Sequence, residues 1–383
     1  MTRERTDVEG APWTLADEEA LLTGMLQHYT PSGAERVLSE WLCEQLGSPR
    51  LRVEVDAVGN FIAELQATVD TPEPPCVLLG HLDTVPGFIP VRRESERLYG
   101  RGAVDAKGPL AAFLAATMRL AARETTRRFP IIVVGAVEEE AATSRGARAV
   151  LDRWRPAYTI IGEPSSADAV TLGYKGRLLA SCRVEQPVAH TARPEEGACA
   201  RAVAFWQAVQ QSAEAWNAAH VRPGDPASYF SMLMPSLRTI HSGSDGFTDW
   251  CEMEIGYRLP PEYDPHALEA WLTKRAQAEG VQIRFRGAET AYRAPRHGPL
   301  ASAFVRALRA EGMTPGFKLK TGTSDMNVVG PVWNCPILAY GPGNSALDHT
   351  PNEHINLTEY YQAINVLERV LAEIQLTTCA PLG

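Results

Sequence analysis

The order of apolar and polar residues predicts an α/β domain in the first part of the chain. Three apolar runs, at residues 76–80, 131–137 and 158–162, have the length and the boundaries of buried strands. Between the first two runs lies an alanine-rich stretch that begins after Gly108-Pro109, and proline suits the first turn of a helix. Strands that alternate with helices form a βαβ series, so a sheet flanked by helices is expected.

The pattern changes in the middle of the chain and then returns. The intervening segment is typical of strand, helix, strand, helix and strand, with helices expected at 195–219 and 265–279. That order fits a small α+β domain with one exposed sheet edge. We therefore expect a catalytic domain formed by residues 1–172 and 296–383, interrupted by an inserted domain at residues 173–295.

The length and net charge of the chain limit which classes of protein it can belong to. A chain of 383 residues can bury a large core and is expected to divide into about two domains. Its 46 acidic and 37 basic residues give a net charge of −9. This balance argues against general nucleic-acid binding, which depends on a basic surface, and leaves open a local basic patch that faces an acidic partner.

Cysteine usage and hydropathy indicate the compartment. The seven cysteines are scattered and form no CxxC pair, so a disulfide framework is not expected. The N-terminal residues lack the apolar core of a signal peptide. The longest mostly apolar helix candidate, at about 109–122, is too short to span a bilayer. We expect a soluble cytoplasmic protein without a membrane partner.

Acidic residues and histidines gather directly behind the predicted strands. His81-Leu82-Asp83, Glu138-Glu139-Glu140 and Glu163 each follow one of the apolar runs, while Asp105 and Asp348-His349 follow glycine-rich turns. Open α/β folds place ligand sites at strand ends. Carboxylates are seldom buried unless they are paired or bound to metal, so such a cluster at one edge of a sheet predicts metal ions.

Each candidate also has a simpler interpretation. A lone histidine such as His81 is more often structural, but strand alternation points Asp83 the same way, and a carboxylate behind a ligating histidine fixes its tautomer. Asp105 suits a helix N-cap, yet its two oxygens also suit a bridge between metals about 3.5–4 Å apart. His190, in VAHTARPEEG, fits a turn histidine on composition alone.

The triple glutamate is the least ordinary of these segments. Consecutive glutamates usually form a solvated run, but these three end a strand that is apolar throughout. One glutamate in such a place can bind metal while a neighbour stays free as a general base.

The chain resembles the M20 metallopeptidases, a family of dinuclear zinc aminoacylases and carboxypeptidases, in six segments that keep the family's order: GHLDTVP, YGRGAVDAKGPLAA, VEEE, IIGEPS, GTSD and DHTPNEH. The resemblance implies an α/β fold class, with a zinc-peptidase-like catalytic domain whose mixed sheet is flanked by helices. It also implies an inserted α+β, ferredoxin-like domain that acts as a lid or in dimerisation. The implied cofactors are two Zn²⁺ ions, with Co²⁺ as a substitute.

The resemblance also assigns roles to individual residues. It implies five metal ligands: His81 and Glu163 for one ion, Glu140 and His349 for the other, and Asp105 as the bridge. Glu139 is the implied general base, Asp83 the residue that orients His81, and His190 a catalytic histidine delivered across a dimer. The implied substrate contacts are Arg258, Thr323, Ser324 and Asn344. A surface arginine is an equally good interpretation of Arg258.

Within the family, the chain is most similar to LysK-type enzymes in the segments GYKGRLL, VEEEAATSRGAR, TGTSDMNVV and YGPGNSALDHTPNEHI. Those enzymes release lysine, and in some members ornithine, from the C-terminal glutamate γ-carboxyl of LysW, a small acidic amino-group carrier protein. The resemblance implies a homodimer that takes LysW as its substrate in lysine or arginine biosynthesis. Basic residues near the domain junction suit such a tail, although they are more often simply solvated: Lys175, Arg177, Arg183 and Arg193.

Two other functions stay open. A small-molecule N-acyl amino acid deacylase, of the acetylornithine deacetylase or succinyl-diaminopimelate desuccinylase type, would use the same metal chemistry. A metal-dependent scaffold or regulator that kept the fold is the non-enzymatic alternative. The complete ligand set and Glu139 argue against it.

Overall fold

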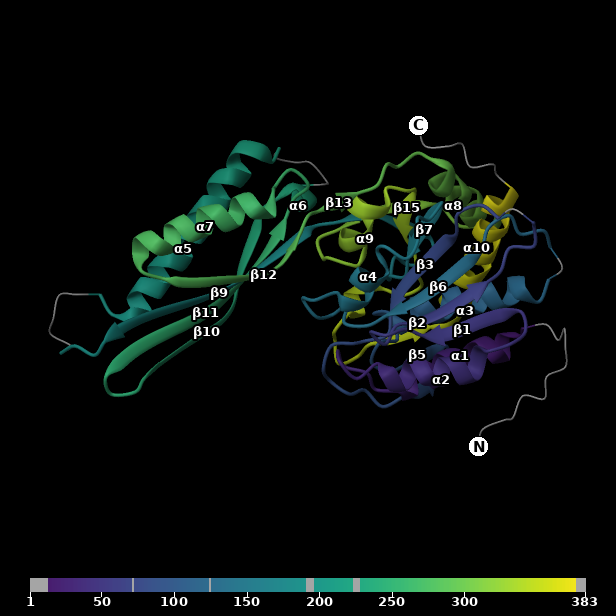
Figure 1. Ribbon diagram of the computed structural model, residues 1–383, viewed down its shortest axis with the longest axis horizontal. Coiled ribbons are helices and arrows are strands. Elements are labelled where there is room, and N and C mark those ends of the chain that lie inside the picture. The colour runs from purple at the N-terminus through teal and green to yellow at the C-terminus, as the bar shows by residue number, and fades with distance from the viewer. Residues whose placement is uncertain (1–12, 71, 124, 191–195, 223–227, 377–383) are drawn as a thin grey trace. The chain divides into compact units, whose positions relative to one another are not determined.

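The computed structural model describes residues 13–70, 72–123, 125–190, 196–222 and 228–376, and these divide into two compact units. The smaller unit consists of the described residues of Gly173–Arg293 together with Leu319–Asn327. The remaining described residues form the larger unit (Figure 1). A role for the smaller unit as a lid or dimerisation domain stays a prediction.

The larger unit contains most of a mixed sheet of nine strands in the order β1-β2-β6-β3-β7-β15-β8-β13, with β14 paired to β8. The strands of this sheet have these bounds: β1 Leu51–Val55, β2 Phe61–Leu65, β3 Cys76–His81, β6 Ile131–Ala136, β7 Tyr158–Ile161, β8 Ala169–Tyr174, β13 Tyr292–Arg293, β14 Gly316–Lys320 and β15 Ile337–Ala339. Strand β13 and the last residues of β8 and β14 belong to the smaller unit. A second, three-stranded sheet has the order β16-β5-β4, with β4 Arg92–Glu94, β5 Arg97–Tyr99 and β16 His354–Asn356.

The three apolar runs form neighbouring strands at the centre of this sheet. β3 lies between β6 and β7 and is parallel to both. Every residue of the three strands is buried, which is typical of parallel strands covered on both faces. Parallel strands run in the same direction, so their carboxyl ends lie at the same edge of the sheet.

Helices cover the sheet of the larger unit. Their bounds are α1 Leu15–Gln27, α2 Arg36–Leu46, α3 Lys107–Ala121, α4 Arg145–Val150, α8 Pro299–Ala310, α9 Met326–Trp333 and α10 Leu357–Leu376. Helix α3 packs on β3 and β6 and is itself covered by α1 and α10, so nearly all of its residues are buried. Small residues permit this close packing, since a Cβ added at Gly162 would lie 2.9 Å from Cε2 of Phe113.

The smaller unit has a four-stranded antiparallel sheet in the order β10-β11-β9-β12, with α5 and α7 packed together on it (Figure 1). Its main elements are β9 Gly176–Pro187, α5 Ala198–His220, α6 Ser228–Ser231, β10 Met234–Ser244, β11 Thr248–Leu259, α7 Pro265–Glu279 and β12 Gln282–Glu289. Setting aside the four-residue α6, the chain order is βαββαβ, which is the ferredoxin-like arrangement.

Two expectations about local structure were wrong. The predicted βαβαβ order lacked β10, an edge strand whose residues are mostly exposed and therefore show no apolar alternation. The pattern of residues 145–154 also predicts a helix, but α4 ends at Val150. The predicted helix after Gly108-Pro109 is α3, which begins slightly earlier, at Lys107. In the described part of the chain, no helix has both the length and the apolar character needed to cross a membrane.

Candidate metal centre

The candidate ligands lie at the carboxyl edge of the three central strands. His81 is the last residue of β3 and pairs in register with Ala136, the last residue of β6. The glutamates 138–140 follow directly after β6, and Glu163 follows the end of β7. The sheet register therefore brings together segments that lie far apart in the sequence.

Two groups of side chains could each hold a metal ion. His81, Asp105 and Glu163 offer ligand atoms within 4.8 Å of one another, and Asp105, Glu140 and His349 do the same. Asp105 belongs to both groups. Its Oδ1 lies 3.3 Å from His81 Nε2, and its Oδ2 lies 2.9 Å from His349 Nε2. The two oxygens of one carboxylate thus face two different imidazoles, as a bridging ligand requires.

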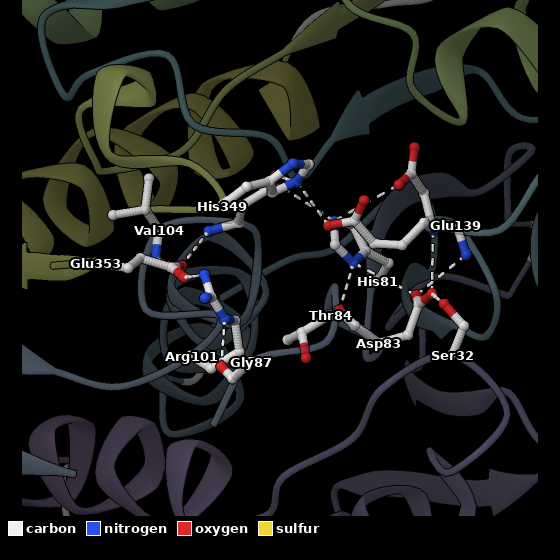
Figure 2. A network of polar contacts seen from close by, with 12 residues as sticks. Ser32, His81, Asp83, Thr84, Gly87, Arg101, Val104, Glu139, His349 and Glu353 are labelled. Carbon is white, nitrogen blue, oxygen red and sulfur yellow. Dashed lines mark hydrogen bonds and ion pairs between the residues drawn. The ribbon is translucent and has the colours of Figure 1, made fainter. Parts of the chain in front are cut away.

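Contacts of both imidazoles with further glutamates complete this arrangement, and Figure 2 shows His81, His349 and Glu139 at the centre. His349 Nε2 lies 3.0 Å from Glu140 Oε1, and His81 Nε2 lies 3.9 Å from Glu163 Oε1. Glu139 Oε2 lies 4.0 Å from His81 Nε2, but Glu139 belongs to neither group among the residues that the structure describes. Glu139 is therefore beside the centre without being part of either ligand set.

The charges of the centre explain why it suits cations. Burial by itself lowers the pKa of His81, but hydrogen bonds to Asp105 and Asp83 outweigh it and hold this pKa well above the ordinary histidine value. Hydrogen bonds to Asp105 and Glu140 raise the pKa of His349 to about 10. The carboxylates thus draw positive charge to both imidazoles. Imidazole nitrogens with carboxylate oxygens form a donor set that suits zinc, cobalt and related metals.

Burial acts differently on the two carboxyl groups that His349 contacts. Desolvation raises the pKa of Glu140, because it outweighs the hydrogen bond from His349. Burial also acts to raise the pKa of Asp105, but hydrogen bonds from His349 and His81 outweigh it, and the pKa falls well below the usual range. Asp105 is therefore the carboxylate that most strongly keeps its negative charge.

Asp83 connects His81 to the glutamate loop. His81 Nδ1 lies 2.9 Å from the backbone carbonyl of Asp83, whereas Asp83 Oδ1 is 3.5 Å away. The fully buried Asp83 carboxylate instead accepts the backbone N–H groups of Glu139 and Glu140, each at 3.0 Å, and the hydroxyl of Ser32 at 2.7 Å. One residue therefore fixes both the histidine and the loop that carries Glu139 (Figure 2).

Glu35 is a second buried carboxylate that binds the backbone of the loop carrying Glu139. It was not among the residues predicted from the sequence. It is only 2% exposed, and its Oε1 accepts the backbone N–H groups of Gly33 at 2.9 Å and of Glu138 at 3.0 Å. Glu138 has a left-handed backbone with φ of 58°, and its side chain contacts Thr143 and Arg145. No motif in the sequence marks Glu35 for this role, because the backbone N–H of Glu138 that it binds lies far away in the sequence.

The predicted substrate contacts fall into two groups. Arg258, Thr323 and Ser324 lie in the smaller unit, where Arg258 Nη1 donates to Thr323 Oγ1 at 2.7 Å. Ser324 is buried, and its hydroxyl accepts the N–H of Met326 at 3.2 Å. Asn344 is an exposed residue of the larger unit whose side chain accepts the N–H of Ala346.

Basic residues of the smaller unit include a buried lysine. The side chain of Lys175 is inaccessible to solvent and donates to the backbone carbonyls of Tyr229 and Met232. Burial, together with the charge of Arg258, lowers the pKa of Lys175 to about 8. His190 is exposed just beyond the end of β9, and Arg193 lies outside the described residues.

Fold and site together define a dinuclear-type metallohydrolase, and comparisons with known proteins place the chain in a family. Residues 77–373 match the model of peptidase family M20/M25/M40, so the chain belongs to that family, which comprises amide-bond hydrolases. The resemblance predicted from the motifs is thereby confirmed.

Curated relatives extend over most of the chain. A protein of Deinococcus radiodurans named "[LysW]-lysine hydrolase" is 42% identical over 90% of this chain and 93% of its own length. A Sulfurisphaera tokodaii protein named "[LysW]-lysine/[LysW]-ornithine hydrolase" is 28% identical over 93% of this chain and 95% of its own.

Among solved structures, an M20 family metallo-carboxypeptidase from Sulfolobus solfataricus superposes with a TM-score of 0.78. The match covers 94% of this chain and all of that one, at 18% identity. This likeness concerns the fold, and it confirms the expected α/β class with a mixed sheet flanked by helices.

Metal titration tests the two ligand groups. Metal-free protein is expected to bind two equivalents of Zn²⁺ or Co²⁺ in calorimetry, and His349→Ala to keep only one tight site, because Asp105 and Glu140 lose their nitrogen partner. At a hundredfold excess over its dissociation constant, one bound ion stabilises the fold by about 2.7 kcal/mol, which thermal unfolding detects.

The control for this titration is His354→Ala, which removes a half-buried histidine at the start of β16 and should still bind two ions. Two tight sites in His349→Ala would contradict the assignment.

Proposed function

We propose that the protein hydrolyses the amide bond between lysine and the γ-carboxyl of the C-terminal glutamate of an acidic carrier protein, LysW, with ornithine as a second cargo. This reaction belongs to lysine or arginine biosynthesis and takes place in the cytoplasm. Family membership and the names of the relatives support the substrate. The observation that carries the chemistry is Asp105, whose two oxygens face two imidazoles while Glu139 stands beside His81.

The proposed cofactors are two Zn²⁺ ions, for which Co²⁺ can substitute. His81 and Glu163 would hold one ion, Glu140 and His349 would hold the other, and Asp105 would be shared by both. The nitrogen and oxygen donors of the two groups support this assignment. When bound, such a pair of metals lowers the pKa of water and polarises an amide carbonyl.

Glu139 is the proposed general base. Its backbone N–H donates to Asp83, so the loop is fixed while the carboxylate remains close to His81. From that position Glu139 takes a proton from the attacking water and returns it to the departing amine nitrogen of the cargo. Asp83 supports the reaction by holding His81 and the Glu139 loop in place.

Recognition of the cargo is assigned to the smaller unit and to Asn344. The Arg258 side chain can hold a carboxylate with its planar fork, and its hydrogen bond to Thr323 orients it. Ser324 and Asn344 complete the proposed contacts. The charge of Arg258 and the nearby buried Lys175 favours an anionic group in this region.

A homodimer is the proposed assembly, with His190 acting in the partner's active site and the smaller unit serving as lid and dimerisation domain. Support comes from β10, the outer strand of its sheet, whose second edge has no partner strand among the described residues. Ile240 on this strand is 45% exposed. An exposed strand edge of this kind is a ready site for pairing with another chain.

Release of free lysine tests the substrate. The enzyme should cleave lysine-loaded carrier with a kcat/KM at least about tenfold above that for N-acetyl-lysine, because a carrier contributes at least roughly 1.4 kcal/mol of extra transition-state binding. A chelator should abolish both reactions. The opposite preference would favour the small-molecule deacylase, and no turnover of either compound would favour a non-enzymatic scaffold.

Glu139→Gln tests the general base. We expect turnover of loaded carrier to fall about 10²–10⁴-fold, while fold and metal content stay the same, because only the proton acceptor is lost. Glu138→Gln is the matched control, since that neighbouring side chain contacts Thr143 and Arg145 instead. Equal activity of the two variants would rule out Glu139 as the base.

Mixed dimers test His190. Alone, His190→Ala and Glu139→Gln should both be nearly inactive. Refolded together, they should regain roughly a quarter of wild-type activity, because random pairing gives one intact composite site in half of the dimers. His266→Ala, which alters an exposed histidine paired with Glu269, is expected to stay active alone. Absence of recovery in the mixture would exclude a shared site.

A further inference from the structure

A buried ion pair outside the candidate ligand groups connects the two loops that carry Asp105 and His349. Arg101 Nη1 lies 2.8 Å from Glu353 Oε2, and the residues are 7% and 0% exposed. Figure 2 shows the pair beside His349, on the far side of the centre from Asp83. Neither residue belongs to the two groups of possible metal ligands described above.

Both partners also form hydrogen bonds with backbone groups, in these two loops and in the segment that follows β3. Glu353 Oε1 accepts the N–H groups of Val104 at 3.0 Å and of Asp105 at 3.1 Å. Arg101 donates to the carbonyl of Thr350 at 3.2 Å and to that of Gly87 at 2.8 Å. The pair is therefore bonded to the backbone of Asp105 itself and to that of the residue next to His349.

We propose that Arg101 and Glu353 are positioning residues for the metal centre. Together they set the spacing between Asp105 and His349 and thereby the affinity of the site that these residues share. A buried ion pair adds little net stability compared with apolar packing, so its main contribution is the geometry that it imposes. His349 needs this support, because half of its side chain is exposed and its φ is 60°. This inference rests on the proposed metal-binding role.

Glu353→Gln is the principal variant. Glutamine keeps one oxygen for the two backbone N–H groups but loses the charge that pairs with Arg101. We expect affinity for one of the two Co²⁺ ions to fall about 10–100-fold, as is usual when a residue that supports a ligand is changed. Calorimetric titration of metal-free protein measures the affinity, and the visible absorption of bound Co²⁺ reports a changed ligand geometry.

Glu18→Gln is the matched control. Glu18 is also 0% exposed and pairs with an arginine, Arg119, at 2.6 and 3.0 Å, but this pair connects α1 to α3. Both variants should lower the unfolding temperature of the metal-free protein, and only Glu353→Gln should change metal affinity and the Co²⁺ spectrum. Wild-type affinity and spectrum in a folded Glu353→Gln protein would overturn the proposal.

Arg101→Lys provides a second test if Glu353→Gln fails to fold. Lysine keeps the charge but loses the fork that reaches Gly87 and Thr350, so we expect about a tenfold loss of affinity. Unchanged affinity in this variant would also overturn the proposal. If the wild-type protein binds no metal, the proposed function fails. If wild type and variants bind two ions equally, only the positioning role fails.

Discussion

Several carboxylates meet two imidazoles at the carboxyl edge of three parallel strands, and the structure is organised around keeping this negative charge in place. The carboxylates divide by their hydrogen-bond partners. Asp83, Glu35 and Glu353 are buried and accept backbone N–H groups from the loops around the centre. Asp105 and Glu140 instead direct oxygens at the imidazoles. The first kind fixes the loops, and the second kind is left to hold cations.

This division also explains how neighbouring glutamates can have different roles. The backbone N–H of Glu138 donates to Glu35, and those of Glu139 and Glu140 donate to Asp83. Two buried carboxylates therefore hold the backbone of three consecutive residues in place. Their side chains then diverge: Glu138 contacts Arg145, Glu140 contacts His349, and Glu139 stays outside both ligand groups. A proton carrier needs such a position, because a carboxylate that binds metal is no longer available as a base.

The smaller unit contributes a different kind of chemistry. Its ferredoxin-like sheet leaves β10 as an outer strand, and the buried Lys175 and the Arg258–Thr323 pair give this unit positive charge. In the proposed function, the larger unit carries the chemistry of bond cleavage. The smaller unit and Asn344 are proposed to decide among lysine-loaded carrier, ornithine-loaded carrier and small acyl-amino acids.

The sequence alone determined the central strands, because fully buried parallel strands are continuous apolar runs. It also drew attention to His81, Glu140 and Glu163, because polar residues directly behind such runs are conspicuous, whereas Asp105 and His349 stood out through the family's motifs. It did not reveal β10, whose exposed residues follow no apolar period. Nor did it reveal the roles of Glu35, Arg101 and Glu353, which act on backbone groups distant in the sequence. Only the tertiary structure decides which backbone N–H groups these side chains bind. Every residue except proline carries a backbone N–H, so the residue type does not show which of them will be a partner.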